Sequence, residues 1–298
     1  MLMPSSNKII EEVLSRYAKY PLALTGCRTT ERALECCEYD FVIIAEGTKK
    51  KGSDLLEVNG DYAEIHFISP NIDPFEIAPG LHGMRVINDP SWVLSSLKQQ
   101  VDEAHPKALV LYSRKKAVDA LLYANRAVEA AGEEDTVMPS LWLKFAAYYY
   151  LEATISRAGE IPMPTHMLAQ LRSIENKTLA EGVALATSCL ELERANRSSV
   201  SRSIEASAGL NEKLGGNYAT QLVRRKASFL CDSGMYADCH LYLGYVARGA
   251  VAGIVADRKA LRDYRFAISI AMDLTSDQSF ALRLSRELLD ACSELLKS

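Results

Sequence analysis

The chain has 298 residues, with 34 Lys and Arg against 38 Asp and Glu, which gives a formal net charge of −4. An acidic chain does not attract duplex nucleic acid through its overall charge, so that class of partner has no strong case. No apolar run approaches the roughly 20 residues that a membrane-spanning helix needs, so we expect no membrane partner. The N-terminal residues of the sequence are polar, so we expect no secretory leader, and the seven cysteines form no CxxC pair. We therefore expect a cytoplasmic protein with free thiols.

The N-terminal part of the chain alternates helical and strand-like segments. Apolar residues at helical spacing predict a helix over about 7–19, followed by an apolar strand at 22–25. Thr29 or Thr30 is a suitable cap for a short helix in the segment that follows. A continuously apolar strand at 39–45 comes next, as expected for a strand in the middle of a sheet.

A hairpin is predicted over residues 54–69. Its signal is the dipeptide Asn59-Gly60 between two strand-like runs, which is the strongest short-range indication of a hairpin turn. On the second strand, Glu64 and His66 share one face because strand side chains alternate. His66 is either a structural polar residue or a group that orients Glu64.

The pattern changes after the hairpin. Residues 70–90 are rich in Pro and Gly and are expected to be irregular. A helix begins near Trp92 and is expected to end at His105-Pro106, and the rest of the chain has helical periodicity. The run 141–151 is apolar nearly all round, which predicts the buried axis of a bundle. Lys144 interrupts this run, and we expect its stem to reach the surface rather than a substrate.

These patterns predict an α+β N-terminal domain with a small mixed sheet, followed by a larger all-α helical-bundle domain. The change in character places the two domains at residues 1–107 and 108–298. A chain of this length is consistent with two domains.

The chemistry of the sequence is concentrated between the first two strands. Gly26 begins a turn directly after strand 22–25, and Glu38 and Asp40 stand one residue apart at the start of strand 39–45. Side chains two residues apart on a strand lie on the same face. Two carboxylates on one face beside a backbone turn are suited to holding a divalent metal against a triphosphate.

This stretch resembles the signature of the nucleotidyltransferase superfamily, whose catalytic domain has the polymerase-beta-like fold. The signature is Gly followed by Ser or Gly, a spacer, and an acid–apolar–acid–apolar run. Here it corresponds to Gly26-Cys27, the spacer 28–37 and Glu38-Tyr39-Asp40-Phe41. The resemblance covers residues 22–68 and is to the minimal and antibiotic-modifying members, which are commonly followed by a helical domain.

The resemblance implies a metal-dependent enzyme that moves a nucleotidyl group from a nucleoside triphosphate to a hydroxyl acceptor. Glu38 and Asp40 would bind Mg²⁺ or Mn²⁺. Glu64 on the neighbouring strand would be the third catalytic acid, with Asp61 as the alternative if the strand register differs.

The resemblance also implies how the triphosphate is held. Gly26 and Cys27 would offer backbone N–H groups to phosphate, and Arg28 would donate to a triphosphate oxygen. The acceptor is left open between a small molecule, a protein side chain and an RNA end, and a homo-oligomer is left open as well.

Two positions depart from the family pattern. Cys27 stands where a serine hydroxyl usually meets phosphate, and Glu38 replaces the more usual aspartate. A thiol is a weaker hydrogen-bond donor than a hydroxyl. These departures keep a second interpretation open, in which the domain is a catalytically inactive nucleotide-binding or protein-interaction module of the same fold.

Overall fold

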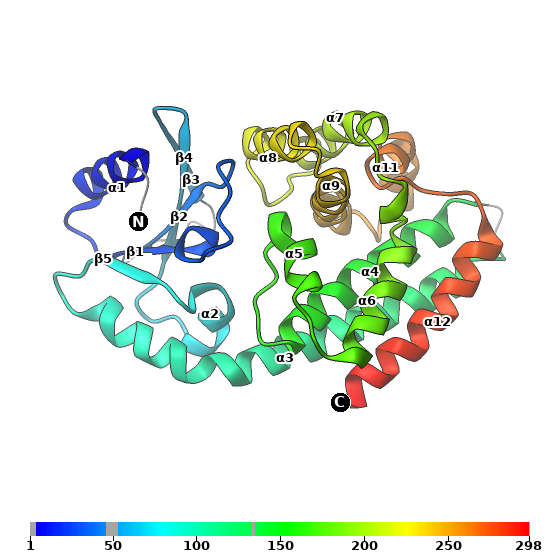
Figure 1. Cartoon of the computed structure of the whole chain (residues 1–298), viewed down its shortest axis with the longest axis horizontal. Coiled ribbons are helices and arrows are strands. Elements are labelled where there is room, and N and C mark those ends of the chain that lie inside the picture. The colour runs from blue at the N-terminus through cyan, green and yellow to red at the C-terminus, as the bar shows by residue number, and fades with distance from the viewer. Residues whose placement is uncertain (1–3, 46–52, 133–134, 298) are drawn as a thin grey trace. The chain divides into compact units, whose positions relative to one another are not determined.

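A computed structural model describes residues 4–45, 53–132 and 135–297 of the chain. The chain forms two compact units, Met1–Leu109 and Val110–Ser298. The first contains a small mixed sheet of five strands, and every described element of the second is a helix (Figure 1). The predicted fold class is therefore confirmed.

The sheet has the strand order β3-β4-β2-β1-β5. β2 and β4 run parallel, and every other neighbouring pair is antiparallel. The predicted strands and the predicted hairpin are all present, with the Asn59-Gly60 turn between β3 and β4. The strands are β1 (Leu22–Thr25), β2 (Tyr39–Ile44), β3 (Ser53–Val58), β4 (Asp61–Ile68) and β5 (Arg85–Asn88).

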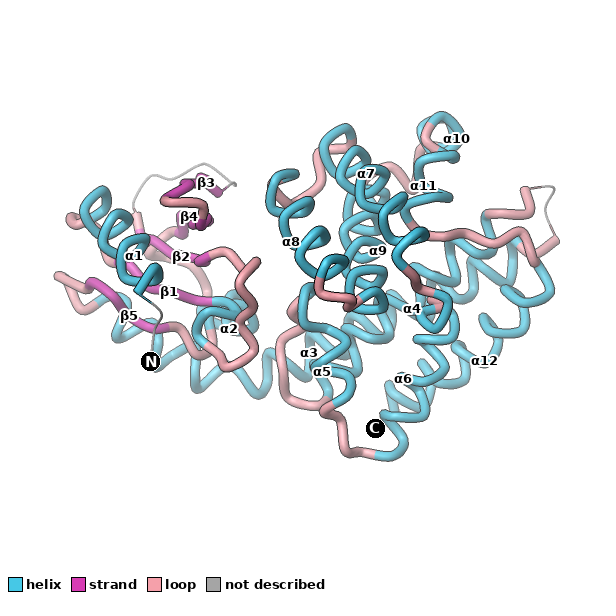
Figure 2. Tube along the Cα trace, turned by 45° about the horizontal axis from the view of Figure 1, so that its top comes forward, coloured by secondary structure: helices cyan, strands magenta, loops and turns pink. Residues whose placement is uncertain are grey.

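Helix α1 (Pro4–Tyr17) covers one face of the sheet (Figure 2). Ile9 and Val13 of this helix are fully buried in a cluster with Phe41 and Ile65 of the two central strands. Burying a side chain of this size contributes about 1.5–3 kcal/mol. The odd-numbered positions of β2 thus form the apolar face that anchors the sheet to α1.

The opposite face packs on α2 (Pro74–Leu81) and on the first turns of α3 (Val93–Ala130). Val42 and Ile44 of β2 are buried here in a cluster with residues of both helices. Because strand side chains alternate, Asp40 shares this face with Val42 and Ile44. Asp40 therefore lies at the end of a packed apolar face, on the second residue of β2.

The segment after Gly26 differs from the prediction. The short helix expected after Thr30 is absent, and the chain forms only a 3-10 turn over Gly26–Thr29 before irregular chain. The guanidinium of Arg28 donates to the Cys37 carbonyl at 2.5 Å and to the Glu35 carbonyl at 3.3 Å. These bonds, between residues nine and seven positions apart, fold the segment back on itself, so its capping residues do not start a helix.

The expectation of irregular chain over 70–90 is also wrong. Asp73 caps α2 by accepting a hydrogen bond from Phe75 N at 2.9 Å, and Pro74 occupies the first turn, where its missing N–H costs nothing. β5 then pairs with β1 at the edge of the sheet. The Asp73 cap is a local sequence signal, but the many Pro and Gly residues of this segment led to the prediction of irregular chain. The pairing of β5 with β1 is a tertiary contact that no local pattern indicates.

Helix α3 continues through Pro106, where the sequence predicts its end. It is 38 residues long. A proline inside a helix costs about 3 kcal/mol, because it removes an N–H donor and crowds the preceding turn. Burial of Val101, Ala108 and Leu109 on either side of Pro106 offsets that cost. No helix of the described chain combines the length and apolar character needed to cross a membrane.

The helical unit is built around α4 (Met138–Arg157), whose residues are buried almost throughout, as predicted for a bundle axis. Two 3-10 turns, Pro164–His166 and Leu192–Arg194, interrupt the helices. The remaining helices are α5 (Met167–Arg172), α6 (Lys177–Cys189), α7 (Arg197–Lys213), α8 (Thr220–Asp232), α9 (Tyr236–Ala252), α10 (Arg258–Asp263), α11 (Arg265–Ala271) and α12 (Gln278–Lys297).

Helix α6 approaches α4 closely at Gly182. A Cβ atom at this position would lie 1.9 Å from the hydroxyl oxygen of Tyr150. That separation is far below a van der Waals contact, so the ring of Tyr150 occupies the space that any side chain at residue 182 would need. The glycine and the tyrosine together set the spacing of the two helices.

Lys144 does not reach the surface, which corrects the prediction. Its ammonium donates to the Asp273 carbonyl at 2.7 Å and lies 3.5 Å from a carboxylate oxygen of Glu191. A buried charge is costly unless it is paired and hydrogen-bonded. Glu191 belongs to a distant turn, so this pairing has no local signal in the sequence.

A second buried ion cluster joins α3, α4 and α9. Glu152 is fully buried and pairs with Arg248 and, at 2.5 Å, with Lys116. The guanidinium of Arg248 lies 4.3 Å from the ring centre of Tyr149 and 4.6 Å from that of Tyr245. One carboxylate therefore compensates two cations from two other helices.

We predict that Glu152→Gln destabilises the protein by about 3–5 kcal/mol, because it leaves two cations without their carboxylate in the interior. The matched control is Glu205→Gln. Glu205 pairs with Arg224 at 3.0 Å on the surface, where such a pair contributes about 0–1 kcal/mol. Chemical denaturation of both variants measures the difference. Equal losses would show that the buried cluster is no more important than a surface pair.

Candidate functional site

The parallel pairing of β2 with β4 brings acidic residues together. Asp40 lies opposite Glu64, and Val42 lies opposite His66. Partners in register on adjacent strands lie on the same face, and His66 shares that face because it is two residues after Glu64. Ligand atoms of Asp40, Glu64 and His66 all lie within 4.8 Å of one another.

Neighbouring groups orient this cluster. The Ser53 hydroxyl on β3 donates to Glu64 Oε1, and the other oxygen, Oε2, lies 3.9 Å from His66 Nε2. The Glu64 side chain is mostly buried, whereas the His66 ring is 42% exposed. One oxygen of Glu64 is thus held by the protein, and the other faces the imidazole.

Gly26 is placed against Asp40 by the antiparallel pairing of β1 with β2, in which Thr25 lies opposite Asp40. Its φ of +69° is in the left-handed region that side chains disfavour. A Cβ atom at this position would lie 2.1 Å from Asp40 Oδ2. The backbone turn and the carboxylate are therefore in direct contact, as only a glycine allows.

Cys27 follows this turn and remains a thiol. A hydrogen bond with Cys37, burial and the nearby carboxylates of Asp40 and Glu38 all raise the pKa of the Cys27 thiol well above its usual range. A protonated thiol is a poor nucleophile. This environment disfavours the thiolate of Cys27, and the predicted contribution of its backbone N–H to phosphate binding stays a prediction.

Arg28 is engaged within its own loop. Besides its hydrogen bonds to backbone carbonyls, its guanidinium carbon lies 4.4 Å above the ring centre of Tyr39. These contacts give Arg28 a structural role in shaping residues 30–37. Its predicted contact with a triphosphate stays a prediction.

The other predicted acids lie elsewhere. Glu38 immediately precedes β2, and among the described residues it does not belong to the group formed by Asp40, Glu64 and His66. Asp61 is three residues before Glu64 on β4, so it lies on the opposite face of that strand. The sequence left the role of His66 open between a structural residue and one that orients Glu64. Its spacing of two residues from Glu64 is the sequence signal that places it in the group with Asp40 and Glu64.

The group of three fits a divalent cation. An octahedral ion with ligands at about 2.1 Å requires ligand atoms about 3 Å apart when adjacent and about 4 Å apart when opposite. The 3.9 Å between Glu64 Oε2 and His66 Nε2 agrees with that geometry, and the upper bound of 4.8 Å on all separations lies slightly above it. Two carboxylates and one imidazole suit Mn²⁺ better than Mg²⁺, which prefers oxygen ligands.

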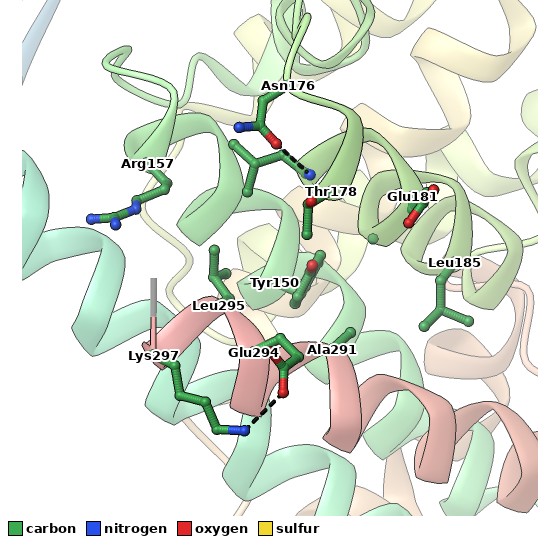
Figure 3. Close-up of a pocket in the computed structure, with 12 residues that line it drawn as sticks. Tyr150, Arg157, Asn176, Thr178, Glu181, Leu185, Ala291, Glu294, Leu295 and Lys297 are labelled. Carbon is green, nitrogen blue, oxygen red and sulfur yellow. Dashed lines mark hydrogen bonds and ion pairs between the residues drawn. The ribbon is translucent and has the colours of Figure 1, made fainter.

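The helical unit has hollows that sequence reasoning missed. One, of about 720 Å³, lies among α4, α6 and α12, with the Tyr150 hydroxyl and Arg157 in its lining (Figure 3). Lys297 pairs with Glu294 at 2.8 Å at its edge. The lining of this hollow holds two basic and two acidic side chains, so it has no net preference for a charged ligand.

Comparisons with known proteins add little to this geometry. No protein-family model matches the sequence, and no curated protein is significantly similar to it. One solved structure, a nucleotidyltransferase-like protein from Exiguobacterium sibiricum, is similar over 88% of this chain and 91% of its own length. The identity is 11% and the TM-score is 0.40. A similarity of this size carries no argument about fold or function.

We predict that Gly26→Ala both destabilises the first unit and weakens binding of Mn²⁺. The left-handed backbone costs an alanine about 1–2 kcal/mol, and the new methyl group must displace the Asp40 carboxylate. Gly60→Ala is the control, because Gly60 has a φ of +85° but no atom within 4 Å of a built Cβ.

Thermal denaturation with and without Mn²⁺ separates the two effects. Both variants should lose stability, but only Gly26→Ala should lose the stabilisation by Mn²⁺. Retention of that stabilisation in Gly26→Ala would show that the Asp40 carboxylate does not hold the ion.

Proposed function

We propose that the first unit is a nucleotidyltransferase-type module that moves a nucleotidyl group from a nucleoside triphosphate to a hydroxyl acceptor with the help of Mg²⁺ or Mn²⁺. The observation that carries the proposal is the convergence of Asp40, Glu64 and His66 on one face of the sheet, in contact with the Gly26 turn. The sequence signature over residues 22–68 supports the same class of chemistry.

Asp40 and Glu64 would hold the cation, with His66 as a third ligand and Glu38 as a ligand to a further ion. When bound, such a cation neutralises triphosphate charge and favours attack at phosphorus. The backbone N–H groups of Gly26 and Cys27 would receive phosphate oxygens. The contact between Gly26 and Asp40 would then bring the phosphate and the ion side by side.

Alternatively, Glu64 would leave the cation to Asp40 and His66 and take the proton of the acceptor hydroxyl. Its Oε1 is occupied by the Ser53 hydroxyl, so Oε2 is the oxygen suited to that role. The acceptor oxygen would form a bond to the α-phosphorus as the bond to the bridging oxygen breaks and pyrophosphate leaves. A small molecule, a protein side chain or an RNA end would all provide such a hydroxyl.

A catalytically inactive module that binds nucleotides or proteins is the second candidate. Three observations favour it: Arg28 is engaged within its loop, Glu38 lies outside the cluster, and no α-helix follows the Gly26 turn to direct its dipole at phosphate. In its nucleotide-binding form, this module places a ligand at the same residues as the enzyme and differs from it only in turnover. In its protein-interaction form, it needs no ligand at these residues.

We predict that a triphosphate with Mn²⁺ or Mg²⁺ stabilises the wild-type protein by about 2.7 kcal/mol at a hundredfold excess over its dissociation constant. Asp40→Asn should abolish the metal-dependent part of this stabilisation. It should leave the protein without ligand intact or slightly more stable, because two carboxylates a few ångströms apart repel each other. Asp61→Asn, on the other face of β4, is the control and should behave as wild type.

Thermal shifts with each of the four triphosphates, in either metal or in EDTA, measure this. Release of pyrophosphate in the presence of an acceptor distinguishes the enzyme from the inactive module. The absence of any metal-dependent shift would contradict the enzyme and the nucleotide-binding module, and would leave the protein-interaction module. A shift that persists in Asp40→Asn would place the ligand elsewhere.

A further inference from the structure

Helix α3 buries small side chains in the second unit and exposes large apolar ones. Leu111 and Val118 are each 52% exposed, and Leu122 is 49% exposed. Single exposed aliphatic residues are ordinary, but a contiguous group of them on one face marks an interaction surface. The residues of α3 that are buried in the apolar core of this unit lie on the opposite face and are all alanines: Ala117, Ala120, Ala124, Ala127 and Ala130.

The exposed residues follow the spacing of a coiled coil. Five exposed positions of α3 are separated by four, three, four and three residues, and all of them belong to the second unit. This alternation keeps side chains in line on one face of a helix, where a second helix packs against them. We call these five residues the α3 seam: Leu111, Lys115, Val118, Leu122 and Asn125.

The exposed charges at the seam are basic. Lys115 lies within the seam and Arg114 flanks it, and no ion pair of the described chain involves either residue. Asp119, on the other flank, is half-buried. About 22 Å of helix separates Lys115 from the end of α3 at Ala130. The charge at Lys115 therefore does not depend on residues 133–134, which lie outside the described chain.

A second copy of this chain does not complement the seam. Parallel pairing of two α3 helices would bring the two Lys115 ammonium groups together. Antiparallel pairing would place each Lys115 against an uncharged residue of the other seam, because the seam contains no carboxylate. A charge that is buried without a partner is costly. The occupant that fits the seam therefore supplies a carboxylate of its own.

We propose that the α3 seam binds an amphipathic helix of a partner protein, with aliphatic residues along one face and a carboxylate that pairs with Lys115. The spacing of the seam favours a helix as the occupant, and the charges of Lys115 and Arg114 favour an acidic one. All of the seam belongs to the second unit, and no metal or nucleotide is needed. The proposal is therefore independent of the function proposed for Asp40 and Glu64.

A designed peptide tests the proposal on the full-length protein. The probe is a fluorescent helical peptide of about 20 residues with Leu at the a and d positions and Glu at the flanking e and g positions, where like charges keep it from pairing with itself. A matched peptide has Lys at the same flanking positions. Fluorescence anisotropy follows the titration of each peptide. We expect the Glu peptide to bind about tenfold more tightly than the Lys peptide.

Substitutions on the exposed face of α3 locate the binding site. Lys115→Glu should reverse the preference between the two peptides, because the charge within the seam changes sign. Val118→Glu should weaken binding of the Glu peptide about tenfold, because it places a carboxylate at the centre of the apolar seam. Phe266→Glu is the matched control, since Phe266 is 79% exposed but lies on α11, outside the seam. It should bind both peptides as the wild type does.

Three results would overturn the proposal. The first is that the Glu peptide does not bind, or binds no more tightly than the Lys peptide. The second is an equal loss in Phe266→Glu and Val118→Glu, which would show only a diffuse attraction to the acidic peptide.

The third is a different occupant of the same seam. Self-association of the protein in analytical ultracentrifugation that Val118→Glu abolishes would assign the seam to a second copy. Binding to phosphatidylglycerol vesicles that Val118→Glu abolishes would assign it to a membrane surface. None of these results would affect the metal-dependent stabilisation at Asp40, so failure here is distinguishable from failure of the proposed function.

Discussion

The parallel pairing of β2 with β4 is the interaction on which the candidate site depends. β3 occupies the edge of the sheet, and β4 returns between β3 and β2, so that Asp40 and Glu64 meet in register. A slip of one residue would turn Glu64 to the face covered by α1. The apolar packing of β2 on both faces prevents that slip, and the same packing that stabilises the sheet therefore fixes the geometry of the acids.

The site balances opposing electrostatic demands. Asp40 and Glu64 bring two carboxylates close together, and Ser53 and His66 both contact Glu64. A cation bound between the two carboxylates would lower their mutual repulsion. The helical unit behaves differently, because Glu152 is surrounded by two cations and Lys144 is hydrogen-bonded and paired. Its buried charges are compensated within the fold itself.

The elements that could be predicted from the sequence are those with local signals. The prediction of the hairpin is confirmed, because the Asn59-Gly60 turn fixes the register of its strands. The predictions of β1 and β2 are confirmed as well, because both strands are short and continuously apolar. The irregular segment after Gly26 depends on the hydrogen bond from Arg28 to the carbonyl of Cys37, nine residues later, and strand β5 depends on pairing with β1, far earlier in the chain. No local pattern contains that information.

The same limit applies to the sites. Asp40, Glu64 and His66 lie on strands whose alternation can be read from the sequence, so their common face was predictable, although the choice of His66 over Glu38 required the strand register. One hollow of the helical unit is lined by both Arg126 of α3 and Arg258 of α10, which lie more than a hundred positions apart in the chain. Charge patterns along the sequence do not show that these residues share a hollow.

The contact between Tyr150 and Gly182 has a consequence for how this chain can diverge. With the tyrosine hydroxyl in the space of the absent Cβ, an alanine at residue 182 is compatible only with a smaller side chain at residue 150. An alanine at residue 182 together with Tyr150 would clash, and a smaller residue at 150 together with Gly182 would leave a cavity between α4 and α6. In proteins descended from the same ancestor, these two positions should therefore co-vary, and a substitution at one of them should be found together with a compensating substitution at the other.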